Sequence, residues 1–77
     1  MKKRAEKIRE LAGQMENEKS AYERMSKAHK VVAATGEFFR AYLEKMRKNR
    51  LWLSSDDLLA VDMYEVRLRA EHIMEHV

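Results

Sequence analysis

The residues best suited to chemistry are two histidines and a glutamate near the end of the chain. His72, Glu75 and His76 form the pattern His-x-x-Glu-His. Histidines at positions i and i+4 of a helix share one side, and two imidazoles placed there can hold a transition metal such as zinc. A tetrahedral zinc site has four ligands, so this pair would leave half of the shell to water.

The pattern resembles the inverted zincin motif of metallopeptidases. In that family the glutamate acts as a base toward a metal-bound water, and a further carboxylate ligand lies well downstream. Only Val77 follows the pattern here, which leaves no room for that ligand or for a substrate cleft. We therefore expect no enzyme, no catalytic residue, no cofactor and no metal site, with His72 and His76 as the candidate pair for weak zinc or nickel binding.

A second candidate is the basic and aromatic segment 40–52. Basic side chains on one side of a helix can neutralise phosphates, and an aromatic ring can stack on a base. Glu37 and Glu44 dilute the positive charge of this segment. Nucleic-acid binding is therefore the alternative function, with contacts from Arg40, Lys45, Arg47, Lys48 and Arg50 beside Tyr42 and Trp52.

Composition indicates a helical protein. The 77 residues include no proline, no cysteine and two glycines, and 38% of them are charged, which is typical of long helices. Without cysteine there is no disulfide framework, and we expect a cytoplasmic location. No apolar run approaches the roughly 20 residues that span a bilayer, so no membrane partner is expected.

A hydrophobic repeat runs through residues 8–53, with apolar positions at alternating steps of three and four. This spacing places them on one side of a helix, as a seam for another helix. We expect one helix over 2–35 and a second helix, or its continuation, over 37–53, kinked or broken near Gly36 because glycine tolerates the conformation that ends a helix. Ser20 and Glu23 match the capping-box pattern Ser/Thr-x-x-Glu, so a helix could restart at Ser20. The repeat keeps its phase there, which favours continuity.

A last helix is expected over 56–76. The run Ser54–Asp57 suits a helix start, because serines accept hydrogen bonds from the first free N–H groups and aspartates favour the positive end of the helix dipole. Residues 54–77 carry two basic and six acidic side chains, a net −4, after a basic middle segment. We expect Asp62, Glu65 and Glu71 to lie against that basic segment. The apolar side of this helix is predicted from Leu59, Met63, Val66, Ala70, Ile73 and Val77.

The whole chain, residues 1–77, is expected to be one all-α domain, a small helical bundle. A first element of the expected length could reach about 65 Å, about twice the last helix, so one chain would not cover its own seam. We therefore predict a homodimer that acts as a non-catalytic protein–protein interaction module, an adaptor, regulator or inhibitor bound to a partner protein. The predicted dimer seam is Ile8, Leu11, Met15, Tyr22, Met25 and Val32, and the predicted partner or bundle face is Phe38, Phe39, Tyr42, Leu43, Met46 and Trp52.

Overall fold

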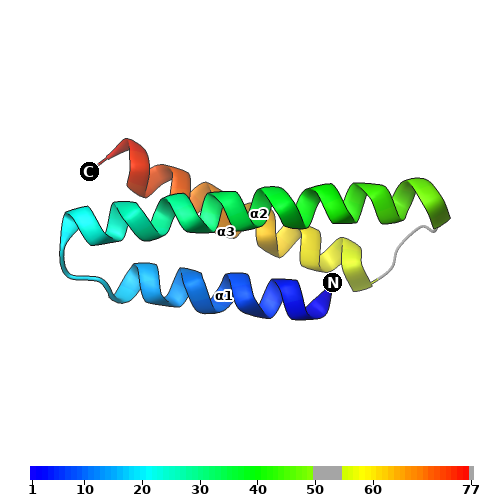
Figure 1. The fold of residues 1–77 in the computed structure, drawn as a ribbon, viewed down its shortest axis with the longest axis horizontal. Coiled ribbons are helices and arrows are strands. Elements are labelled where there is room, and N and C mark those ends of the chain that lie inside the picture. The colour runs from blue at the N-terminus through cyan, green and yellow to red at the C-terminus, as the bar shows by residue number, and fades with distance from the viewer. Residues whose placement is uncertain (50–54, 77) are drawn as a thin grey trace.

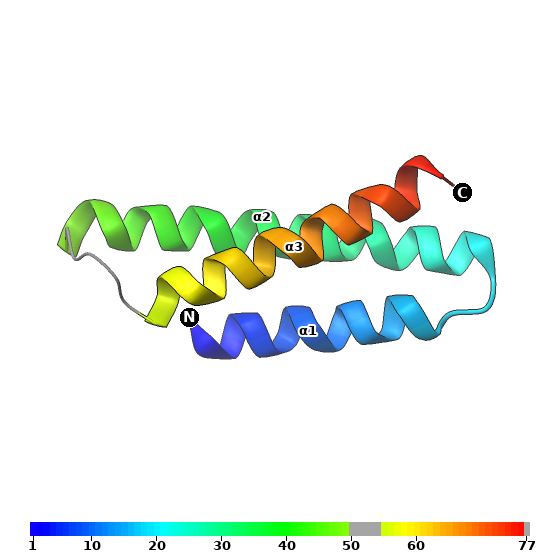
Figure 2. The same cartoon turned by 180° about the vertical axis from the view of Figure 1, so that it is seen from behind.

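The computed structural model describes residues 1–49 and 55–76, which form three helices and no strand. These are α1 (Lys2–Asn17), α2 (Ala21–Asn49) and α3 (Ser55–Glu75). Helices α1 and α2 lie side by side and antiparallel, and α3 packs across them in the same direction as α1 (Figure 1 and Figure 2). The expected all-α bundle is confirmed.

The chain first reverses between α1 and α2. Glu18 has an extended backbone (φ −72°, ψ 132°), and the Oγ of Ser20 accepts a hydrogen bond from the backbone N–H of Glu23 at 3.5 Å. The guanidinium of Arg24 donates to the Glu18 carbonyl oxygen at 2.6 and 3.2 Å. The capping box therefore starts a new helix, and the prediction of one helix over 2–35 is wrong.

Helix α2 continues without a break through Gly36. Val31 and Phe38 are buried on its inner side, and burying such side chains outweighs the cost of a helical glycine, which is about 1 kcal/mol. The Oγ1 of Thr35 donates to the carbonyl oxygen of Val32 at 2.8 Å, inside the same helix. The predicted kink or break at this glycine is therefore wrong.

The core lies where the three helices meet, and every helix contributes to each of its two clusters. Ile8 and Met15, which we expected in a dimer seam, are only 2% and 0% exposed within one chain. The molecule is 43 Å long, not about 65 Å, because α1 folds back along α2. One chain thus covers this part of its own seam, contrary to the prediction. One cluster contains Ala5, Ile8, Phe38, Ala60 and Met63, and the other contains Met15, Ala28, Val31, Ala70 and Ile73.

Helix α3 presents its predicted apolar side to this core. Met63, Ala70 and Ile73 are buried, and Leu59 and Val66 pack against the buried residues. This part of the prediction is confirmed. Within the described residues, none of the helices combines the length and the apolar content needed to cross a membrane.

Several predictions fall on residues 50–54 and 77, which lie outside the described residues. They include the last residues of the helix expected over 37–53, and Ser54 at the expected start of the last helix. They also include the proposed contacts Arg50 and Trp52, and Val77 on the predicted apolar side of the last helix.

Candidate functional site

The two histidines near the C-terminus lie against each other. The ring centroids of His72 and His76 are 4.3 Å apart, with the ring planes tilted by 47°, and both side chains are exposed. The backbone N–H of His76 donates to the His72 carbonyl oxygen at 3.1 Å, which extends the last turn of α3. In the described part of the chain, no three His, Cys, Asp or Glu side chains are grouped to hold a metal. The pair therefore offers two imidazoles on an open surface.

The basic residues of α2 do not form one continuous site. Arg40 and Arg47 are exposed and, being seven residues apart, share one side of the helix. Lys45 instead forms an ion pair with Asp56 in the first turn of α3. Lys48 is exposed but lies about 80° around the helix from Arg40. The structure thus separates the predicted phosphate contacts.

Acidic residues of α3 do reach α2, but they are not the ones expected. Besides the Lys45–Asp56 pair, the hydroxyl of Tyr42 donates a hydrogen bond to Asp57. Both contacts hold the start of α3 against the end of α2. The predicted acids lie elsewhere: Asp62 pairs with Arg9 of α1, Glu71 pairs with Arg67 of α3, and Glu65 has no ion pair to any described residue.

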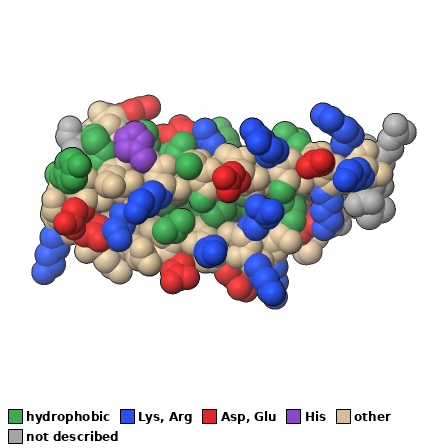
Figure 3. All heavy atoms as spheres, viewed as in Figure 1, with side chains coloured by type: hydrophobic (Ala, Val, Ile, Leu, Met, Phe, Trp, Pro, Cys, Tyr) green, Lys and Arg blue, Asp and Glu red, His purple; other side chains and the backbone are tan. Residues whose placement is uncertain are grey.

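Basic residues at the start of α1 lie alongside α2. Helix α2 extends beyond the start of α1 (Figure 1), and Met1 packs against the core cluster that contains Phe38. Lys and Arg side chains are frequent on this side of the molecule, including the end where α1 begins (Figure 3). The basic residues at the start of α1 are all exposed, and two of them, Arg4 and Lys7, line a shared pocket with Ala34 and Glu37 of α2. The full set is Lys2, Lys3, Arg4 and Lys7.

The remaining residues of the predicted dimer seam and the described residues of the predicted partner or bundle face do not form a single surface. Phe38 is fully buried, whereas Tyr22 is 81% exposed and Leu43 is 60% exposed. The others are intermediate, so each has a side turned toward the bundle: Leu11, Met25, Val32, Phe39, Tyr42 and Met46.

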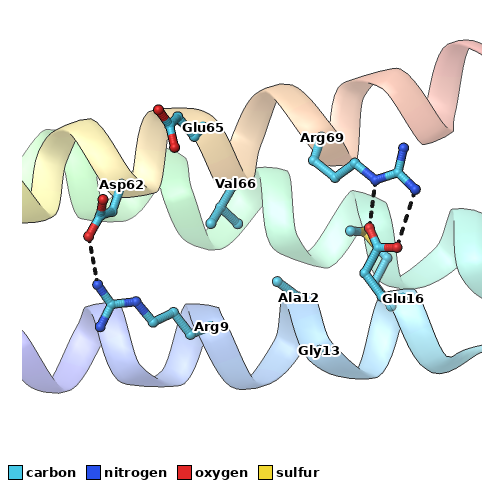
Figure 4. Close-up of a pocket in the computed structure, with 9 residues that line it drawn as sticks. Arg9, Ala12, Gly13, Glu16, Asp62, Glu65, Val66 and Arg69 are labelled. Atoms are coloured by element: carbon cyan, nitrogen blue, oxygen red, sulfur yellow. Dashed lines mark hydrogen bonds and ion pairs between the residues drawn. The ribbon is translucent and has the colours of Figure 1, made fainter.

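A groove with a volume of about 440 Å³ runs between α1 and α3 (Figure 4). Ala12, Met15 and Val66 supply apolar lining. Gly13 keeps the groove open, because no atom lies within 4 Å of the place where its Cβ would be. The groove therefore combines an apolar lining with charged side chains, and small residues of α1 form part of its wall.

Two ion pairs cross this groove (Figure 4). Arg9 Nη2 lies 2.9 Å from Asp62 Oδ2, and Arg69 donates to Glu16 at 2.6 Å through Nε and at 3.2 Å through Nη2. The hydrogen bond from Arg69 lowers the pKa of the Glu16 carboxyl. Glu16 is therefore ionised at neutral pH and unsuited to donate a proton.

The outer side of α3 carries four exposed apolar residues. Leu58 is 71% exposed, Val61 58%, Tyr64 55% and Leu68 47%. Their spacing of three, three and four residues places them on one side of the helix, opposite the buried Met63 side. These four residues are the α3 outer stripe.

Sequence reasoning missed this stripe because it assigned only one apolar side to α3. The signal was present, since Leu58, Val61, Tyr64 and Leu68 repeat at helical spacing alongside the inner set. Helix α3 therefore has two apolar sides, one buried and one exposed. The described part of this chain covers only one of them.

Comparison with protein-family models, curated proteins and solved structures found no match to this chain.

Proposed function

We propose that this chain is a non-catalytic protein–protein interaction module, an adaptor, regulator or inhibitor that binds a partner protein through the α3 outer stripe. The exposure of Leu58, Val61, Tyr64 and Leu68 carries this proposal, because the opposite side of the same helix already fills the core. Exposed apolar side chains that line up on a surface mark interaction sites. Their helical spacing suits a partner that lies along the helix.

The α1–α3 groove supports a non-catalytic role. None of the described residues that line it is a histidine, serine or cysteine. Arg9, Asp62, Glu16 and Arg69 are engaged in ion pairs with one another. A nucleophile with an adjacent base, or an acid with a pKa near neutral, is what acid–base or covalent catalysis needs.

The homodimer stays a prediction, but its interface has to differ from the predicted seam. Ile8 and Met15 are buried within one chain, so a dimer through them would require the bundle to open. Two copies must instead meet through exposed residues. Light scattering at tens of micromolar tests this, because a dimer should give a mass near twice 9.2 kDa.

Affinity capture from the native host with matched variants tests the proposed function. Leu68→Lys places a charge in the outer stripe, whereas Leu43→Lys makes the same change on an exposed part of α2. We expect wild type and Leu43→Lys to retain the same partner and Leu68→Lys to lose it, with equal helicity in all three. Equal retention by the Leu68 variant would exclude the outer stripe as the binding surface.

Nucleic-acid binding is the second candidate, and the exposed basic residues at the start of α1 and on α2 favour it. Binding through phosphates weakens steeply with salt, whereas an apolar contact does not. We expect negligible DNA or RNA binding in 150 mM salt, measured by gel shift at two salt concentrations. Sub-micromolar, salt-sensitive binding that is abolished in the double variant Arg40→Glu and Arg47→Glu would favour this alternative.

A further inference from the structure

Around the α3 outer stripe, the arginines of α3 form ion pairs, whereas two glutamates have no ion-pair partner among the described residues. Both arginines of α3 are engaged, Arg67 with Glu71 and Arg69 with Glu16. Glu65 and Glu75 are exposed, and neither forms an ion pair with any residue of 1–49 or 55–76. The net charge left on the outer side of α3 is therefore negative.

Glu65 lies at the edge of the stripe. It follows Val61 by four residues and precedes Leu68 by three, so all three side chains are neighbours on the helix surface. In Figure 4 its carboxylate lies on the side of α3 away from α1, whereas Asp62 and Arg69 reach toward α1. Because Glu65 also lines the α1–α3 groove, it marks the border between the groove and the stripe.

Glu75 extends the negative charge toward the end of α3. It lies seven residues after Leu68, which returns to the same side of the helix. The carbonyl groups at a helix C-terminus carry a partial negative charge that adds to this carboxylate. Glu65 and Glu75 are ten residues apart, about 15 Å along the axis.

We infer that the partner bound by the α3 outer stripe is a cationic amphipathic helix of another protein; this inference rests on the proposed function. Such a helix places its apolar side against Leu58, Val61, Tyr64 and Leu68. Lysine or arginine residues ten or eleven positions apart beside that side meet the two glutamates, because three helical turns span about 16 Å. Complementary charge of this kind sets partner choice and orientation more than affinity.

A second copy of this chain fits the stripe less well. Two antiparallel stripes that overlap fully place each Leu58 opposite the partner's Leu68. The two Glu65 residues then lie only about 6 Å apart along the common axis. In a parallel pair they lie directly opposite each other. Either arrangement brings like charges together beside an apolar contact, which opposes association.

The binding of two designed peptides to the full-length chain tests the inference. Both form the same amphipathic helix with an identical leucine stripe; one carries lysines and the other glutamates at the two flanking positions. Fluorescence anisotropy at 150 mM salt measures both dissociation constants. We expect the lysine peptide to bind at least tenfold more tightly, and Leu68→Lys to abolish the binding of both peptides.

Charge variants separate this inference from the proposed function. In the double variant Glu65→Gln and Glu75→Gln, the ratio of the two dissociation constants should fall to about threefold or less. The glutamate peptide should bind this variant no more weakly than it binds wild type. The matched control, Glu6→Gln with Glu10→Gln on α1, should keep the full preference. Equal binding of both peptides by wild type would overturn the cationic partner but leave the interaction surface standing. If neither peptide binds at millimolar concentration, or light scattering shows a dimer that Leu68→Lys dissociates, the cationic-helix inference is overturned.

Discussion

Glu16 on α1 and Arg69 on α3, 53 residues apart in sequence, form a two-point ion pair at 2.6 and 3.2 Å. Seven residues earlier on each helix, the charges are reversed, with Arg9 on α1 and Asp62 on α3. A slip of α1 by seven residues would place Glu16 opposite Asp62 or Arg9 opposite Arg69. The two pairs therefore specify the register between parallel α1 and α3 more than they add to stability.

A double-mutant cycle measures the Glu16–Arg69 pair. We expect Glu16→Gln and Arg69→Gln to show a small favourable coupling free energy in urea unfolding at low salt, because both side chains are partly exposed. The coupling should fall in 1 M salt, where charges are screened. Strictly additive single variants would show that the ion pair has no energetic role.

Acid should weaken the same contact. Because the folded-state pKa of Glu16 lies below its ordinary value of 4.5, the stability it contributes is present above that value and is lost as pH falls through the folded pKa. Melting temperatures followed by circular dichroism below about pH 5 should therefore fall less steeply in Glu16→Gln than in wild type. Glu6→Gln, an exposed change in the same helix, should follow the wild-type curve.

Replacing Gly36 tests the continuity of α2. A Cβ at this position would lie 3.7 Å from Arg67 Nη1, an ordinary contact. Gly36→Ala should therefore raise the free energy of unfolding by about 0.5–1 kcal/mol, as expected for a helical site. Gly13→Ala, where the Cβ would meet nothing within 4 Å, is the matched control. A loss of stability in Gly36→Ala alone would indicate that the helix ends there.

Phe38 is the largest fully buried side chain among the described residues. Its ring lies 5.6 Å from Phe39 and 6.4 Å from Tyr42, measured between ring centroids. Phe38→Ala should cost about 3–5 kcal/mol, a large part of the stability of so small a domain. Leu43→Ala on the exposed surface should change it by no more than about 0.5 kcal/mol. Similar urea midpoints for the two variants would contradict this core.

Zinc should bind weakly and leave the melting temperature unchanged, because His72 and His76 supply only two ligands. Calorimetric titration with zinc alone, compared with His72→Ala, measures this. A stoichiometric site of sub-micromolar affinity that is lost in His72→Ala would show that a third protein ligand completes the shell.

Periodicity in the sequence was sufficient to predict the helical class and the inner side of α3, because a helix repeats at a fixed angle per residue. Met63, Ala70 and Ile73 are buried where their spacing placed them. The same periodicity was not sufficient to find the turn. A heptad seam indicates that another helix covers it, but Ile8 and Met15 are covered equally well by the same chain or by a second one.

The tertiary structure decided the position of the turn, the continuity of α2 and the side of α3 that is buried. These features depend on contacts between residues distant in sequence. The chain reverses at Glu18, where Arg24 satisfies a carbonyl oxygen, and Gly36 stays helical because long-range packing outweighs its local preference. Helix α3 has two apolar sides, and only its packing against α1 and α2 determines that Met63 faces the core while Leu68 faces outward. The sequence contained both sides, but the choice between them is a property of the folded bundle.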